Sequence, residues 1–250
     1  IALTNCLNFG NPEKPDVYYQ LQQCINGMAE ASEAFDSPII SGNVSLYNET
    51  RNEPIYPTPV IGAVGLTKNI SRHCGIAFRN EGDRVFLLGD EKVLGDPKDL
   101  AGSEYLSLLH GIVAGMPTID IDLELAVQEV CRDLISLDVI KSAHDCSDGG
   151  LAVALAESAI AGDLGFSGNF KLQGRWDAGL FGEAQSRIIV SLGPEKVGTL
   201  KTMCDQRKVQ FCSLGDVTLG KFMINNIIDL DMNLLQEKWS DSLEHIGRSS

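Results

Sequence analysis

Three short segments combine glycine with side chains that carry oxygen or amide groups, and each lies at the end of a predicted β-strand. They span residues 3–12 (LTNCLNFGNP), 41–48 (SGNVSLYN) and 143–150 (AHDCSDGG). Glycine lets a phosphate approach the backbone closely, and Asn or Asp oxygens bind hard cations such as Mg²⁺. The three segments are therefore candidates for binding a phosphorylated ligand and its cation.

The first two segments have a structural interpretation beside the functional one. In 3–12, the Asn and Gly residues are also common in turns and helix caps. In 41–48, Gly42 would admit a phosphate and Asn43 would offer its carbonyl oxygen to Mg²⁺, whereas the alternative is a hairpin turn. Ser45 lies two residues after Asn43, so the two side chains face the same side of an extended chain. Residue types alone leave both interpretations open.

The third segment connects a predicted strand at 139–143 to a predicted helix at 151–161. Ligands of open α/β sheets gather outside the carboxyl ends of strands, and the N-terminus of a helix attracts anions. Asp145 could hold a cation that bridges phosphates. Alternatively, Ser147 or Asp148 caps the helix while the two following glycines make the turn.

Two further combinations are weaker. His144 and Cys146 are two residues apart and could meet as a nucleophilic pair, but no third group that would orient them is identifiable. Residues 182–187 (GEAQSR) precede an apolar strand, and their residue types favour a solvated loop.

Helices and strands in mixed order must position these segments, which indicates an α+β fold with a layered α/β part. Helical spacing predicts helices at 12–36, 103–113, 121–137, 151–161 and from 194 to about 206. Apolar, β-branched runs predict strands at 39–40, 57–65, 84–88, 139–143, 165–172, 187–192, 209–214 and 221–224. Polar residues at 68–82 indicate a domain boundary, so we expect one domain at 1–66 and another at 67–250.

Composition limits the classes of partner. The 250 residues carry a net charge of −14, which argues against nucleic acid and anionic membranes as partners. No apolar run reaches membrane-spanning length, and no signal peptide is visible. The seven cysteines are widely spaced without a Cys-x-x-Cys pair, which indicates reduced thiols in a cytoplasmic protein. The chain starts with Ile in a strand-like run, so we expect a fragment of a longer protein.

Four motifs in this order and spacing carry a resemblance to a known family: LTNCLNFGNPEKP, SGNVSLYNET, YPTPVIGAVGL and AHDCSDGGLAVALAES. They resemble subunit II of phosphoribosylformylglycinamidine synthase, the large subunit of the multi-subunit enzyme. It belongs to the superfamily of aminoimidazole ribonucleotide synthetase and selenide, water dikinase. The resemblance covers essentially the whole chain and the second of two tandem repeats. It implies that 1–66 is the later part of an N-terminal-type domain and 67–250 a C-terminal-type α/β domain.

The resemblance also implies an activity. The family uses ATP and Mg²⁺ in purine biosynthesis to convert formylglycinamide ribonucleotide to formylglycinamidine ribonucleotide through an iminophosphate. A glutaminase subunit supplies ammonia, and a small bridging subunit joins the assembly. The family's catalytic histidine belongs to the first repeat, so no catalytic residue is carried over to this chain. We therefore expect the 250 residues to be inactive without the preceding half.

Five positions match functional positions of the family. The resemblance implies that Asn5 and Gly42 contact ATP, that Asn43 binds Mg²⁺ and that Ser45 contacts the substrate. Asp145 matches a magnesium-binding Asp of the first repeat by pseudo-symmetry. Residues 183–186 resemble a vestigial copy of a substrate loop.

Two other hypotheses compete with the ligase. The chain could be a structural pseudo-repeat that docks partner subunits without catalysis, because it contains no identifiable general acid or base set. It could also belong to another superfamily member with a different substrate. The SGNVSLYN segment and the lack of a reactive Cys in an N-terminal Gly-rich loop argue against that member being selenide, water dikinase or aminoimidazole ribonucleotide synthetase.

Overall fold

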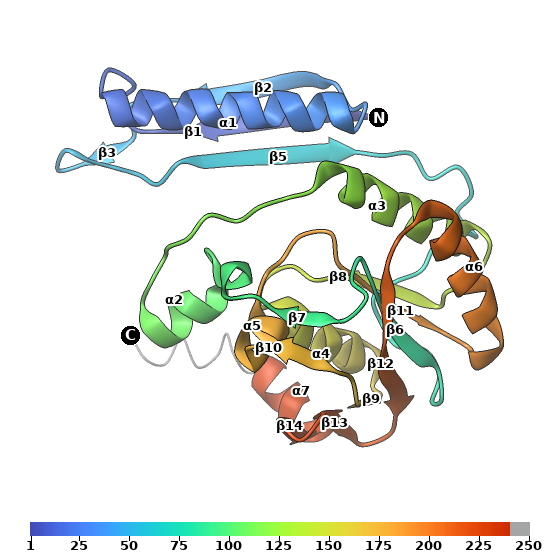
Figure 1. Ribbon diagram of the computed structural model, residues 1–250. Coiled ribbons are helices and arrows are strands. Elements are labelled where there is room, and N and C mark those ends of the chain that lie inside the picture. The colour runs from blue at the N-terminus through green and yellow to red at the C-terminus, as the bar shows by residue number, and fades with distance from the viewer. Residues whose placement is uncertain (241–250) are drawn as a thin grey trace. The chain divides into compact units, whose positions relative to one another are not determined.

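The chain forms two compact units, one spanning Ile1–Ile70 and the other beginning at Ser71. A computed structural model describes residues 1–240, so the last ten residues of the predicted second domain, 241–250, lie outside the described residues. Figure 1 shows the elements of each unit. Within residues 1–240, no helix combines the length and the apolar character needed to cross a membrane.

The first unit is a three-stranded sheet with one long helix. Its strands are β1 (Ala2–Asn8), β2 (Ile39–Ser45) and β5 (Thr58–Val64), its helix is α1 (Pro15–Ala34), and a short hairpin consists of β3 (Glu49–Thr50) and β4 (Glu53–Pro54). The strand order is β2-β1-β5, with β2 parallel and β5 antiparallel to β1. The helix connects the two parallel strands, because parallel neighbours need a crossover of this length.

The core of this unit lies between α1 and β1. Leu7 and Phe9 are buried together with Val17 of the helix. Leu21 and Met28, one and three turns further along α1, pack against the same cluster. Side chains alternate along a strand, so Leu3, Asn5 and Leu7 share the helix side of β1 while its even-numbered residues face away.

The second unit contains a seven-stranded sheet in the order β14-β13-β9-β12-β6-β11-β8. These strands are β6 (Arg84–Leu88), β8 (Ser142–Asp145), β9 (Gly165–Gly168), β11 (Ile188–Leu192), β12 (Phe211–Thr218), β13 (Lys221–Ile224) and β14 (Ile228–Asp231). Neighbours are antiparallel except β9 and β13. A separate parallel pair consists of β7 (Val93–Gly95) and β10 (Leu172–Gly174).

Helices cover both faces of this sheet. One core cluster includes residues of α4 (Gly150–Gly162), α5 (Trp176–Phe181) and α7 (Met232–Ser240), and the other includes residues of α3 (Ile121–Ser136) and α6 (Val197–Arg207). The shorter elements are α2 (Glu104–His110), η1 (Pro97–Leu100) and η2 (Pro194–Lys196). Strand β6 lies between the two layers: Val85 and Leu87 join the α4 cluster, whereas Phe86 and Leu88 join the α3 cluster. The expected α+β fold is confirmed.

Several predicted boundaries are wrong. The strand predicted at 39–40 continues to Ser45, because residues 41–45 pair with β1, so a hairpin turn at 41–45 is excluded. The strand predicted at 139–143 starts at Ser142 instead. The apolar run at Val139 and Ile140 reflects burial in the α3 cluster, and neither residue lies in a strand.

A buried carboxylate provides the first test of this packing. Asp83 is buried, and its Oδ1 lies 2.5 Å from the Lys141 Nζ, while its Oδ2 accepts a hydrogen bond from the Asn80 backbone N at 3.2 Å. We expect Lys141→Met to lower the free energy of unfolding by about 3 kcal/mol, because it leaves a buried carboxylate without its cation. Urea denaturation measures this change.

The matched control is Lys221→Met, which breaks an exposed pair with Asp229. Exposed pairs contribute less than about 1 kcal/mol, so this variant should unfold close to the wild type. Equal losses in the two variants would contradict a structural role for the buried pair.

Candidate functional site

Four of the five predicted site residues lie on two paired strands of the first unit. Across β1 and β2, Asn5 is opposite Gly42 and Asn8 is opposite Ser45, while Asn43 is opposite Cys6. Because paired residues share a face of a sheet, Asn5 and Gly42 belong to the helix side, and Asn43 and Ser45 belong to the open side. The fifth residue, Asp145, belongs to the second unit.

Asn5 and Gly42 are in direct contact. A Cβ atom on Gly42 would lie 2.8 Å from the Cγ of Asn5 and closer still to its side-chain oxygen. The Asn5 amide therefore lies where the side chain of any other residue at 42 would project. The structure thus gives a steric reason for glycine at this position, whether or not a ligand is bound.

The open face of the sheet has a shallow hollow beside these residues. It is lined by Thr4, Asn5, Cys6, Ser41, Gly42, Asn43, Val60 and Gly62. The Ser41 hydroxyl donates to Thr4 Oγ1 at 2.8 Å across the two strands. Hydroxyl and amide groups therefore line one side of the hollow, and this set can bind polar or phosphorylated groups without a basic side chain.

The side-chain amide of Asn48 connects the C-terminal ends of β1 and β2. The Asn48 Nδ2 donates to the backbone oxygens of Ser45 and Phe9, each at 3.0 Å, and lies 3.0 Å from Ser45 Oγ. Asn48 therefore positions the hydroxyl of Ser45. Sequence reasoning missed this role, although Asn48 lies within the segment that it singled out.

An ion pair holds the loop between β1 and α1. The Lys14 Nζ lies 2.8 Å from Glu49 Oε1, which also accepts a hydrogen bond from the Asn11 backbone N at 3.1 Å. The Lys14 hydrogen bond, aided by Asn11, lowers the pKa of Glu49, so this carboxylate stays ionised at neutral pH. The loop between β1 and α1 is thereby fixed to the β3–β4 hairpin that follows β2.

Asp145 is the last residue of β8, and its side chain is exposed. Its Oδ2 accepts a hydrogen bond from Ser147 Oγ, and this bond is the main reason that the pKa of Asp145 is lowered. His144 Nδ1 lies 3.4 Å from Asp145 Oδ1, and His144 Nε2 lies 2.8 Å from Glu157 Oε2. Asp145 is thus an ionised carboxylate available to a cation. Over residues 1–240, however, no group of three or more His, Cys, Asp or Glu side chains is placed to hold a metal ion.

The turn after Asp145 differs from the predicted cap. The N-cap of α4 is Gly149 with φ +77°, a residue without a side chain of its own to cap the helix, so the expectation that Ser147 or Asp148 is the cap is wrong. Instead, Glu183 Oε1 accepts a hydrogen bond from the Gly149 backbone N at 2.9 Å. Gly150 has φ +69°, and a Cβ there would lie 2.9 Å from the carbonyl carbon of Phe181. The loop predicted to be solvated therefore packs directly against the third segment.

The nucleophilic pair of His144 and Cys146 is also excluded. Cys146 is buried in the α4 cluster, and burial raises the pKa of its thiol to about 12. His144 contacts two carboxylates instead. A thiol in this state does not supply a thiolate at neutral pH.

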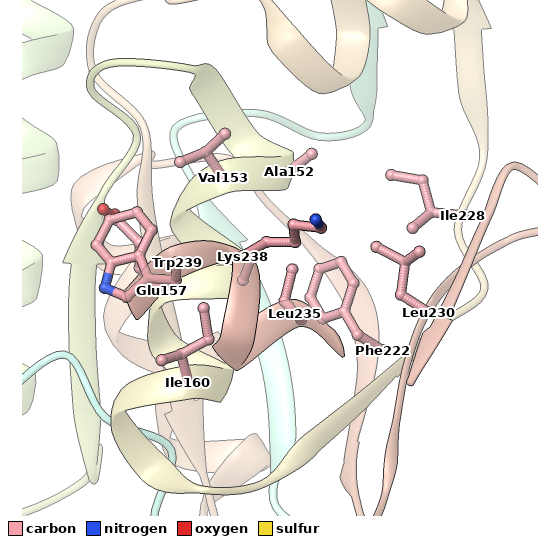
Figure 2. Close-up of a pocket in the computed structure, with 11 residues that line it drawn as sticks. Ala152, Val153, Glu157, Ile160, Phe222, Ile228, Leu230, Leu235, Lys238 and Trp239 are labelled. Atoms are coloured by element: carbon pink, nitrogen blue, oxygen red, sulfur yellow. The ribbon is translucent and has the colours of Figure 1, made fainter. Parts of the chain in front are cut away.

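An apolar groove lies elsewhere in the second unit (Figure 2). It is formed by α4, β13, β14 and α7 and is lined by Ala152, Val153, Ala156, Glu157, Ile160, Phe222, Ile228, Leu230, Leu235, Lys238 and Trp239. Apart from Glu157 and Lys238 its walls are apolar, which does not suit phosphates or Mg²⁺. The hollow in the first unit therefore suits the predicted chemistry better than this apolar groove.

Comparisons with known proteins agree with this division of the chain. Residues 1–67 match the N-terminal domain of AIR synthase related protein, and residues 80–223 match its C-terminal domain. The "Phosphoribosylformylglycinamidine synthase subunit PurL" of Thermomicrobium roseum is 44% identical over 97% of this chain and 33% of the relative. The chain therefore spans about a third of the length of that relative.

Solved structures of Thermotoga maritima PurL have the same fold. The complex with ATP matches with a TM-score of 0.68 and 16% identity, over 94% of this chain and 37% of that chain. The complex with FGAR matches with a TM-score of 0.70 and 16% identity, over 94% and 39%. These likenesses extend across both units.

The β8–α4 turn gives a stability prediction. We expect Gly150→Ala to lower the free energy of unfolding by about 3 kcal/mol, because it adds left-handed strain and a clash with the backbone at Phe181. Gly198→Ala is the control: Gly198 lies in α6 facing open space, so alanine should stabilise by about 0.5 kcal/mol. Thermal unfolding of both variants measures the difference, and a neutral Gly150→Ala would show that the turn is misplaced.

The burial of Cys146 predicts its reactivity. In the native protein at pH 8, iodoacetamide should leave Cys146 unmodified, because the thiol is inaccessible and its pKa is about 12. Cys6, which lines the shallow hollow, should be modified first. Peptide mass mapping separates the two sites, and labelling in urea confirms that both thiols are present. Rapid native modification of Cys146 would restore it as a candidate nucleophile.

Proposed function

The chain belongs to the AIR synthase related family, and from that premise we propose that it is the C-terminal half of an ATP-dependent carbon–nitrogen ligase. The reaction is the conversion of formylglycinamide ribonucleotide to formylglycinamidine ribonucleotide. The relative named PurL, similar over 97% of this chain, and the Thermotoga maritima complexes with ATP and FGAR support the proposal. The observation that carries it is the register of β1 with β2, which brings Asn5, Gly42 and Asn43 together at one polar hollow.

In this proposal the paired strands β1 and β2 form part of the nucleotide site. Asn5 and Gly42 contact ATP, and the missing side chain at Gly42 leaves room for the Asn5 amide beside it. Ser45, held by Asn48, contacts the ribonucleotide. These residues position the two substrates, and positioning is the main requirement of phosphoryl transfer.

A magnesium ion fits this site only in part. Asn43 provides one neutral oxygen, and Mg²⁺ in such sites is usually held by one or two carboxylates together with substrate phosphates. The residues of 1–240 contain no acidic cluster beside Asn43. We therefore assign Asn43 one ligand position and expect the carboxylates to come from the preceding half. A bound Mg²⁺ would neutralise phosphate charge.

The chemistry of the reaction needs no nucleophile from this chain. The amide oxygen of the substrate attacks the γ-phosphorus of ATP and ADP leaves, and ammonia then displaces phosphate from the iminophosphate carbon. A glutaminase subunit supplies the ammonia, and a small bridging subunit joins it to the ligase in the cytoplasm. The 250 residues are inactive without the preceding half, which carries the catalytic histidine.

Asp145 is proposed as a second magnesium ligand. Its ionised carboxylate faces solvent, and Ser147 holds it in place. The amide of Gly149, which could bind a phosphate, is already bonded to Glu183. A cation at Asp145 would therefore bind on the exposed side of the carboxylate.

The function is tested with Gly42→Ala in the full-length protein. The added methyl displaces the Asn5 amide, so the Kd for ATP in the presence of Mg²⁺ should rise about tenfold, as expected for losing one polar contact. Gly27→Ala is the control, because Gly27 lies on α1 with open space around it. Isothermal titration calorimetry measures both affinities.

Two outcomes would contradict the proposal. One is unchanged ATP affinity in Gly42→Ala, which would place the nucleotide away from β1 and β2. The other is conversion of formylglycinamide ribonucleotide by residues 1–250 alone, which would require catalytic groups that we do not assign.

A further inference from the structure

One residue of the loop between α5 and β11 contacts three other segments of the second unit. The Glu183 backbone N donates to the Asp99 backbone oxygen at 2.8 Å, at the end of η1. The Glu183 Oε1 accepts hydrogen bonds from the Gly149 backbone N at 2.9 Å and from the Glu104 backbone N at 2.8 Å. We call this set of contacts the Glu183 bridge.

Both amides in the bridge lie at the starts of helices. Glu104 is the first residue of α2, and Gly149 is the N-cap of α4. Amides at a helix start have no partner within the helix, and a carboxylate there is favourable. The Ser103 side chain caps α2 by accepting a hydrogen bond from the Leu106 amide, and the N-cap of α4 is a glycine. The Glu183 Oε1 atom is therefore the acceptor for two further amides, those of Glu104 and Gly149.

The loop that carries Glu183 is itself firmly held. Arg187 is buried and donates to the backbone oxygens of Gly182 at 2.5 Å and Ala184 at 3.3 Å. The backbone oxygen of Arg187 accepts a hydrogen bond from the Cys146 N at 3.0 Å. The loop therefore presents the Glu183 carboxylate from a fixed position, as a supporting residue must.

From this geometry we infer that Glu183 is a positioning residue for the β8–α4 turn. It fixes the turn that carries Asp145 and Ser147 relative to the start of α2, across 34 and 79 positions of sequence. The two hydrogen bonds require an oxygen at the distance that a Glu side chain spans from the backbone. We infer that this length matters more than the negative charge of the carboxylate. Its consequence for cation binding at Asp145 rests on the proposed function, whereas the bridge itself does not.

Three substitutions in the whole chain separate reach from charge. Glu183→Gln keeps an oxygen at the same reach, Glu183→Asp keeps the charge on a side chain shorter by one methylene, and Glu183→Ala removes both. Gln185→Ala is the matched control, because Gln185 lies in the same loop and its side-chain amide donates to the backbone oxygen of Glu183, which takes no part in the hydrogen bonds to Gly149 and Glu104. Amide-resolved hydrogen exchange and the amide proton shifts of Gly149 and Glu104 are the readouts.

We expect Glu183→Asp and Glu183→Ala to speed exchange at both amides at least tenfold and to move both resonances upfield together. Glu183→Gln should stay within threefold of the wild type, and Gln185→Ala should match it. The Leu106 amide, bonded to Ser103, should be unchanged in every variant. If Glu183→Ala fails to fold, the difference in amide exchange between Glu183→Gln and Glu183→Asp tests the inference without it.

Two results would overturn the inference. Unchanged exchange at Gly149 and Glu104 in Glu183→Ala would show that the carboxylate does not hold them. Faster exchange in Glu183→Gln together with wild-type exchange in Glu183→Asp would show that charge, and not reach, holds the two amides.

A titration with Mg²⁺ separates this inference from the proposed role of Asp145. In the wild type, Mg²⁺ should shift the Asp145 amide resonance, and the apparent Kd should rise at least threefold in Glu183→Asp. No response in the wild type would remove Asp145 as a ligand while leaving the exchange results valid. A response in the wild type that Glu183→Asp leaves unaltered would show that the bridge does not position Asp145.

Discussion

The parallel pairing of β1 with β2 is the constraint on which the first unit depends. It sets Asn5 beside Gly42 and places Asn43 and Ser45 together on the other face. A shift of one residue would exchange the faces of the whole of β2. The α1 helix stabilises this register, because Leu7 of β1 and Phe9, which follows the strand, are buried together with Val17. The core on one side of the sheet therefore determines which polar groups are available on the other.

In the proposed site, polar groups rather than a basic surface would contact the ligand. The net charge of −14 excludes a generally cationic face, and the hollow on β1 and β2 is lined by hydroxyl and amide groups. Lys14, a cation close to the predicted site, is paired with Glu49. An acidic protein can still bind a nucleotide, because Mg²⁺ and oriented amides neutralise phosphates locally.

The sequence predicted the elements better than the contacts between them. Apolar spacing on α1 located the helix to within three residues of its ends, because Val17 is buried and Leu21 and Met28 pack against the same cluster. The same signal failed at Val139 and Ile140, where burial occurs without strand pairing. The family resemblance identified Asn5 and Gly42 as candidates, but only the register of the sheet brings them into contact. The contacts of Glu183 could not be predicted from the sequence, since its two amide partners are backbone groups of residues that are distant in the chain.

The most direct measurement is a crystal structure of the full-length protein with Mg²⁺ and a non-hydrolysable ATP analogue. We expect the nucleotide to contact Asn5 and Gly42, with the Asn43 side-chain oxygen about 2.1 Å from a magnesium ion. The account would be contradicted by a nucleotide that makes no contact to β1 and β2 and binds elsewhere, for example in the apolar groove beside α4 and α7. That result would remove β1 and β2 from the ATP site.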